Sequence, residues 1–153
     1  MLVQMLEKYD LTKTTDGESY EKTLEQYKER LGILQRTLRD QQVPVIIVLE
    51  GWNAAGITRS IGEISRALDP RGFALHSIKQ PTGEERARSF LWRFWLRTPP
   101  RGKIALFARS WYSRAVTDEM QHRASEESVA GRIRQINTFE RQLSDDGTVI
   151  LKF

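Results

Sequence analysis

The chain has 153 residues, of which 39% are hydrophobic and 29% are charged, and its formal net charge is +4. This length and composition favour one globular domain with a real core and exclude wholesale disorder. The absence of cysteine excludes disulfides, thiolate nucleophiles and cysteine-based zinc sites. The longest apolar run, residues 43–49, is too short to cross a bilayer, and no secretory signal pattern is recognisable, so we expect a cytoplasmic protein that does not enter a membrane.

The positive charge is concentrated in the middle of the chain. Residues 71–114 contain ten basic and two acidic residues, a net charge of +8, whereas the segments before and after them each carry −2. Eight of the ten cations are arginines, whose forked guanidinium suits contacts with phosphate oxygens. This segment indicates either a solvated basic surface or a face that binds a polyanion.

The N-terminal part predicts a lead-in over residues 1–17, followed by a long helix. Apolar residues recur there at helical spacing: Tyr20, Leu24, Tyr27, Leu31, Leu34 and Leu38. This spacing predicts one apolar helix face that packs on its own domain. Because the spacing is also heptad-like, a helical dimer contact is the alternative.

From residue 45 onwards, predicted strands alternate with predicted helices. The strands are expected at 45–49, 73–78, 104–107 and 148–153, and the helices at 57–68, 84–98, 111–121 and 125–143. This alternation predicts an α/β domain with a parallel sheet and helices on both faces. A natural domain seldom ends on a strand, so we expect the domain over residues 18–153 to be truncated at its C-terminal end.

The loop after the first strand resembles a phosphate-binding motif. Residues 51–58, Gly-Trp-Asn-Ala-Ala-Gly-Ile-Thr, follow the pattern G-x-x-x-x-G-K-[ST] except that Ile57 replaces the lysine. Backbone N–H groups in such a loop, together with the positive end of the following helix, form an anion nest. The alternative is an ordinary strand-to-helix turn.

Several ordered motifs resemble the polyphosphate kinase 2 family. They are PVIIVLEGWNAAG at 44–56, LDPRGF at 68–73, QPTGEERA at 80–87, FLWRFW at 90–95, PPRGKI at 99–104, FARSWY at 107–112, INTFERQL at 136–143 and DDGTVILKF at 145–153. The resemblance implies a P-loop kinase-like three-layer sandwich whose lid and last strand follow Phe153. It also implies phosphoryl transfer between inorganic polyphosphate and nucleotides such as AMP or ADP, with magnesium.

The resemblance also shows where the chain departs from the family. The family has Asp where this chain has Asn53, the Walker A lysine where it has Ile57, and the Asp of the Walker B-like element where it has Ala108. No catalytic residue is therefore expected to be intact, and no metal ligand is assigned. The expected phosphate-binding residues are Gly51, Ala54, Ala55, Gly56, Thr58, Arg109 and Arg114.

Three functions remain open at this point. The first is a degenerate domain, expected to be the N-terminal half of a tandem polyphosphate:AMP phosphotransferase, that assists folding, dimerisation or regulation of a homologous catalytic half or a homo-oligomer. The second is an active phosphotransferase that recruits Arg59, Lys79 or Lys103 as substitute cations. The third is a non-enzymatic polyanion-binding module. For Arg109 and Arg114, ion pairs with Glu84, Glu85 or Asp118 are the alternative to phosphate contact.

Overall fold

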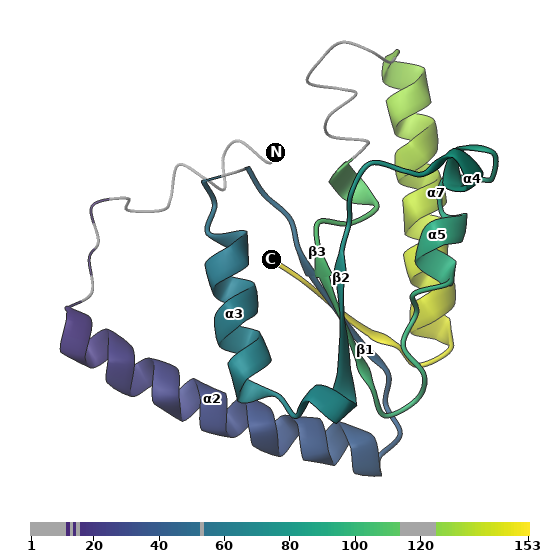
Figure 1. The fold of residues 1–153 in the computed structure, drawn as a ribbon. Helices are drawn as coiled ribbons and strands as arrows, with labels where there is room; N and C mark the ends of the chain where they lie inside the picture. Colours follow the sequence, from purple (N-terminus) through teal and green to yellow (C-terminus); the bar gives the residue numbers. More distant parts are fainter. Residues whose placement is uncertain (1–11, 13, 15, 53, 114–124) are drawn as a thin grey trace.

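A parallel sheet of four strands forms the centre of the domain (Figure 1). The computed structural model describes residues 12, 14, 16–52, 54–113 and 125–153. The strands are β1 (Val45–Leu49), β2 (Phe73–Ser77), β3 (Ile104–Ala108) and β4 (Val149–Lys152), in the order β2-β3-β1-β4. In the parallel register, Val45 pairs with both Ile104 and Val149. The predicted parallel α/β arrangement is confirmed.

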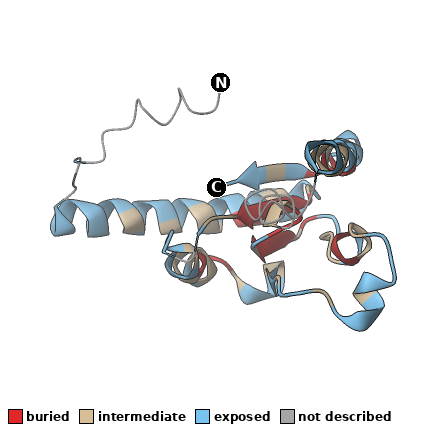
Figure 2. Cartoon of the chain, turned by 90° about the horizontal axis from the view of Figure 1, so that it is seen from above, coloured by how far each residue is buried: buried red, intermediate tan, exposed pale blue. Residues whose placement is uncertain are grey.

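Helices cover both faces of the sheet, and each face has its own hydrophobic core. Helices α2 (Gly17–Asp40) and α3 (Ile57–Ala67) lie on one side of the strands, and α5 (Trp92–Trp95) and α7 (Glu126–Asp145) lie on the other (Figure 1). All five residues of β1 are buried, as are Ile104 to Phe107 of β3 (Figure 2). The continuous apolar run of β1 is thus explained, because both of its faces pack against helices.

Helix α2 forms as predicted, but the face that it presents to the domain differs from the prediction. The Asp16 carboxylate caps its first turn by accepting from the Ser19 N–H at 2.8 Å. Leu31 and Leu38 pack against the core on the α3 side, and Gln35 between them is buried. Tyr27 and Leu34 are exposed, so the predicted apolar stripe is divided between two faces of the helix.

The predicted helix over residues 84–98 is wrong in extent. The structure has two short helices instead, α4 (Gly83–Arg86) and α5. Thr82 and Glu85 form a capping box that starts α4, and Glu85 also pairs with Arg93 in the second helix and with Arg97 just after it. The buried Arg93 donates to the Lys79 carbonyl at 3.0 Å. These contacts fold the segment back on itself, which one straight helix could not do.

The other predicted helices and strands are present where they fall on described residues, with ends that differ by at most two residues. The predicted helix over 125–143 corresponds to α7, and a short 3₁₀ turn, η1 (Pro70–Gly72), precedes β2. Of the predicted helix over 111–121 only residues 111–113 are described, and most of the predicted lead-in over 1–17 also lies outside the described residues. None of the helices described is long and apolar enough to span a membrane.

Candidate phosphate-binding site

The backbone geometry of the loop between β1 and α3 explains why both of its glycines are needed. A Cβ at Gly51 would lie 2.8 Å from the Ala55 Cβ, closer than real Cβ contacts, so the close approach needs glycine. Gly56 has φ of 78° and directly precedes α3, where an L side chain would be strained. The Ala55 N–H donates to the Trp52 carbonyl at 2.9 Å and closes the turn. The loop therefore requires glycine at the two positions that the motif specifies.

A pocket of about 620 Å³ opens at the carboxyl ends of β1, β2 and β3. This is the edge at which ligands bind in open α/β sheets. The residues lining it come from the loop, the first turn of α3 and the ends of β2 and β3: Trp52, Ala54, Gly56, Ile57, Thr58, Arg59, Ser77, Ile78, Lys79, Ala108 and Arg109. Among the residues that the structure describes, no side chain caps the first turn of α3. The backbone N–H groups of that turn, which lies at the pocket, therefore have no capping partner.

Three cations line the pocket although the lysine of the motif is missing. They are Arg59, Lys79 and Arg109. The Arg59 guanidinium also lies over the Tyr20 ring, 5.8 Å from its centre. Arg109 has φ of 65°, a conformation that costs a non-glycine residue about 1–2 kcal/mol. Its N–H donates to the Leu49 carbonyl at 2.9 Å, which helps to hold this strained backbone at the mouth of the pocket.

The Glu50 carboxylate joins the two loops at this edge of the sheet. One of its oxygens accepts from the Ser110 N–H at 2.9 Å and from the Ser110 hydroxyl at 2.8 Å. The other accepts from the Ser113 hydroxyl at 2.8 Å. Sequence reasoning missed this role. A signal was present, because a carboxylate that ends a fully apolar buried strand needs hydrogen-bond donors nearby.

On the α7 side of the sheet, aromatic residues connect the β3 loop to α7 and β4. The Trp111 Nε1–H and the Tyr112 hydroxyl both donate to the Glu140 carboxylate, at 3.0 and 2.8 Å. Lys152 donates to the other Glu140 oxygen at 2.8 Å. Burial and the Glu140 carboxylate raise the pKa of Tyr112, so the phenol stays protonated and donates. This network fixes the loop that carries Arg109 relative to the core.

The structure brings together most of the residues predicted from sequence. Ala54, Gly56, Thr58 and Arg109 line the pocket, and Gly51 and Ala55 belong to the loop that forms its wall. Asn53 and Arg114 lie outside the described residues. Glu84 pairs with Arg88, and Glu85 pairs with Arg93 and Arg97. Arg59 and Lys79, expected as substitute cations, also line the pocket. Ser77 and Ile78 were not predicted to form the site, although the carboxyl end of a neighbouring parallel strand is the place to look for such residues.

The two other positions at which the chain departs from the motifs also face this pocket. Ile57 and Ala108 both line it, so an aliphatic chain and a methyl group occupy the places where a cation and a carboxylate were expected from the resemblance. Lys103, expected as a substitute cation, precedes β3 and lies at the opposite end of the strand. It therefore cannot act in this pocket.

Magnesium does not fit the donors that the described residues offer. Magnesium prefers carboxylate oxygens and water in octahedral geometry. Within residues 16–52, 54–113 and 125–153, no group of three or more His, Asp or Glu side chains could hold a metal ion. The Thr58 hydroxyl lines the pocket, but the Glu50 carboxylate is occupied by Ser110 and Ser113.

The sequence is similar to known phosphotransferases along nearly all of its length. The model of the family described as Polyphosphate kinase 2 (PPK2) matches residues 14–153. A polyphosphate:AMP phosphotransferase from Pseudomonas syringae pv. tomato is 38% identical over 149 residues, which is 97% of this chain and 30% of that relative. An AMP/ADP-polyphosphate phosphotransferase from Meiothermus ruber is 32% identical over 82% of this chain and 50% of its own length. The chain thus spans between 30% and 50% of the length of these two relatives.

Solved structures give the same result. A Pseudomonas aeruginosa PA01 structure designated polyphosphate kinase 2 superposes with a TM-score of 0.90 and 36% identity, covering 98% of this chain and 33% of that one. Polyphosphate kinase 2 from Arthrobacter aurescens TC1 superposes with a TM-score of 0.83 and 27% identity, covering 94% and 56%. The predicted P-loop kinase-like α/β fold is confirmed by these superpositions.

Proposed function

Because this chain belongs to the polyphosphate kinase 2 family, we propose that it is a family domain that binds phosphate groups but does not itself transfer them. In this proposal it assists the folding, dimerisation or regulation of an active catalytic half. One observation carries the proposal: Ile57 and Ala108 both line the pocket beside a loop that keeps its two glycines. The backbone cradle for an anion is retained without the charged groups expected to act on it.

Electrostatics explains why these two positions matter. Phosphoryl transfer depends mainly on positioning and on stabilisation of charge at the transferred group. A cation 4 Å from a phosphate charge contributes about 4 kcal/mol at an effective dielectric constant near 20. Isoleucine supplies none of this energy, and alanine supplies no oxygen to orient a metal. The nest and Arg109 can still attract an anion, so we expect binding without turnover.

An active enzyme with substitute cations is the second candidate. The observation that favours it is the position of Arg59 and Lys79, which line the same pocket as Thr58. In this alternative, one of the two takes the role of the lysine that Ile57 replaces. The family relatives suggest inorganic polyphosphate and AMP or ADP as the substrates to test for both candidates.

The test is a transfer assay with the full chain, long-chain polyphosphate, magnesium and either AMP or ADP. We expect no nucleotide formation above the level of a protein-free control. Turnover that is lost in Lys79→Ala or Arg59→Ala, but not in the exposed control Arg134→Ala on α7, would replace the proposal with the second candidate. Turnover unaffected by all three substitutions would also contradict the proposal.

A restoration variant tests the physical reason. In Ile57→Lys alone, one positive charge returns to a cradle that already has its glycines, and no carboxylate is added beside the anion. We expect tighter binding of tripolyphosphate than in the unmodified chain, measured by calorimetry. Equal binding would show that the pocket does not hold phosphate at this position.

A further inference from the structure

A second cleft lies at the other end of the sheet, where β2 and β3 begin. Its volume is about 480 Å³. Its walls come from α2, the end of α3, the turn before β2 and the turn before β3: Gly32, Gln35, Arg36, Arg39, Ala67, Asp69, Arg71, Gly72, Gly102 and Lys103. We call it the amino-end cleft. Because each strand has five residues or fewer and rises about 3.3 Å per residue, it lies about 16 Å from the loop at the opposite end.

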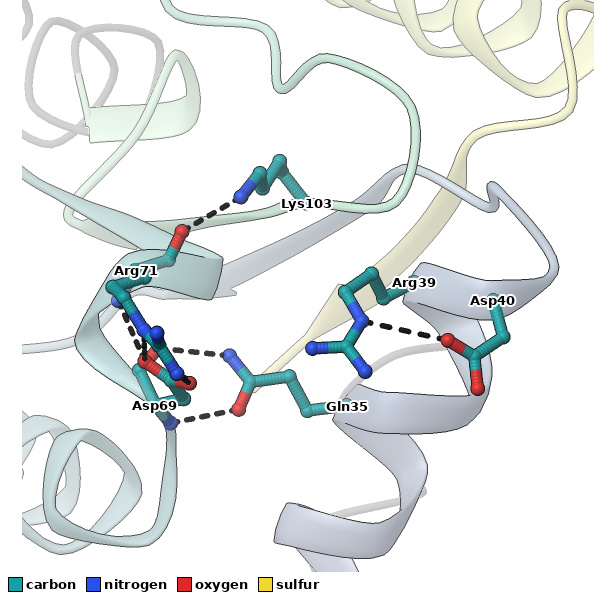
Figure 3. A network of polar contacts seen from close by, with 6 residues as sticks. All are labelled: Gln35, Arg39, Asp40, Asp69, Arg71 and Lys103. Atoms are coloured by element: carbon teal, nitrogen blue, oxygen red, sulfur yellow. Dashed lines mark hydrogen bonds and ion pairs between the residues drawn. The ribbon is translucent and has the colours of Figure 1, made fainter.

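The amino-end cleft carries an excess of positive charge. Four cationic side chains and one carboxylate line it, a net charge of +3. Arg71 pairs with that carboxylate, Asp69, at 2.8 Å, and this guanidinium lowers the pKa of Asp69 to about 2 (Figure 3). Near neutral pH the Asp69 carboxylate and the Arg71 guanidinium are therefore both charged, and their charges cancel. The charges of three further cations remain to be balanced.

These three cations have weak partners or neutral ones. Lys103 donates to the Arg71 backbone carbonyl at 2.7 Å, which orients the ammonium without neutralising it (Figure 3). Arg39 pairs with Asp40 at 3.4 Å between two exposed side chains, an arrangement that contributes little. For Arg36, the described part of the chain shows no hydrogen bond or ion pair. The cations are thus available to a ligand from solvent.

The backbone of the cleft is held in place by a buried side chain. Gln35 is only 6% exposed, and its side-chain amide forms hydrogen bonds with both backbone polar groups of Asp69. It accepts from the Asp69 backbone N–H at 2.7 Å and donates to the Asp69 backbone carbonyl at 3.0 Å. A Cβ at Gly72 would overlap the Gln35 amide, so glycine is required there. Gly102 has φ of 73°, and a Cβ there would lie 3.2 Å from the Arg39 backbone. The walls are therefore built before any ligand arrives, which lowers the cost of binding.

We propose that the amino-end cleft binds a short run of phosphate groups, as a second anion site separate from the loop after β1. Its arginines offer forked donors that match phosphate oxygens, and its volume lies in the range of ligand sites. None of its lining residues is aromatic, so it offers no surface on which a nucleobase could stack. The phosphates come either from a free oligophosphate or from a section of a long polyphosphate chain.

The test is a titration of the full ¹⁵N-labelled chain with tripolyphosphate, followed by amide resonances. We expect saturable shifts at Gly72, Gly102 and Lys103. Arg36→Ala combined with Arg39→Ala should weaken the binding of tripolyphosphate at least about tenfold, as measured from these resonances. The reason is that loss of one hydrogen bond between charged groups weakens binding by about that factor. Both side chains are exposed on a helix, where alanine is well tolerated. The matched control, Arg134→Ala with Arg141→Ala on α7, removes the same charge and should stay within about twofold.

A second arm identifies the source of the phosphates and separates this site from the loop. Tighter binding of long-chain polyphosphate at the same resonances assigns a section of polymer, and equal binding per site assigns a free oligophosphate; both support the proposal. Shifts confined to residues 51–59, equal weakening in both double variants, or preferential binding of single-stranded nucleic acid over tripolyphosphate would overturn it. None of these results depends on whether the chain transfers phosphate.

Discussion

The two loops at the carboxyl edge of the sheet differ in how they are held. The loop after β3 is anchored by side chains: Glu50 accepts from both Ser110 and Ser113, and Trp111 is 1% exposed and bonded to Glu140. The loop after β1 is shaped by its glycines instead, and its tryptophan, Trp52, is 71% exposed. Packing and side-chain hydrogen bonds hold the loop after β3, whereas glycine conformations and the hydrogen bond from the Ala55 N–H to the Trp52 carbonyl shape the loop after β1.

This difference shows how a family framework can persist without the family's charged groups. The replaced positions Ile57 and Ala108 lie in the pocket, but neither contributes to the contacts that anchor the β3 loop. Stability depends on the buried aromatic residues and Glu50, and chemistry depends on charges at the pocket surface. Ile57 and Ala108 nevertheless also pack against the core on the α3 side, so a charged side chain at either position would affect stability as well as the pocket.

The largest expected effect compares the two tryptophans. Trp111→Ala removes a buried indole that contacts the Phe94, Phe107 and Phe139 rings, and it leaves Glu140 without one donor. We expect the free energy of unfolding to fall by about 3–5 kcal/mol. Trp52→Ala should change it by less than about 0.5 kcal/mol. Chemical denaturation followed by circular dichroism measures both, and similar losses in the two variants would contradict the comparison.

A smaller effect is expected at the residue that joins the two loops. Glu50→Gln keeps the size of the side chain but replaces the carboxylate with a neutral amide, so the hydrogen bonds from Ser110 and Ser113 lose their charged acceptor. We expect a loss of about 1–3 kcal/mol in unfolding free energy. Glu126→Gln, exposed in the first turn of α7, serves as the control. Exchange of the Ser110 amide hydrogen should also accelerate in Glu50→Gln but not in the control; unchanged exchange would refute the anchoring role.

The smallest expected effect has opposite signs for stability and binding. Arg109→Gly relieves the positive φ at this position and should stabilise the domain by about 1 kcal/mol. The same change removes a pocket cation, so binding of tripolyphosphate at the loop should weaken. Arg109→Ala is the control, because it removes the charge and keeps the strain. If Arg109→Gly and Arg109→Ala unfold at the same denaturant concentration, the backbone is not strained.

The sequence predicted the parts of the fold that depend on local patterns. The apolar run of β1, the glycine loop and the alternation of strands and helices were read correctly because each follows from residue spacing. The extent of the helix over 84–98 could not be predicted. Its division into two short helices depends on contacts of Arg93 with Glu85 in the first helix and with the Lys79 carbonyl before it, and residue spacing does not reveal these contacts. Likewise, Gln35 rather than Leu34 is buried on α2 because it bonds to Asp69, 34 residues away.

The residues of the candidate site that belong to a motif or follow a strand could also be predicted from the sequence. Gly56 and Thr58 follow from the motif, and Arg109 follows from its place after a strand. The contribution of Ser77 and Ile78 depends on β2 lying beside β3, and the role of Glu50 depends on the β3 loop folding back over β1. Such roles arise from strand order, which residue spacing alone does not determine.

The exposed side chains of strand β4 favour self-association of the protein. Among the strands that the structure describes it lies at the edge of the sheet, and Val149, Leu151 and Phe153 are all exposed. Exposed apolar side chains on an unpaired strand edge promote self-association. Because this association is hydrophobic, added sulfate should strengthen it while weakening phosphate binding. Oligomer measurements and anion titrations on this protein therefore require separate buffers, with light scattering recorded alongside each titration.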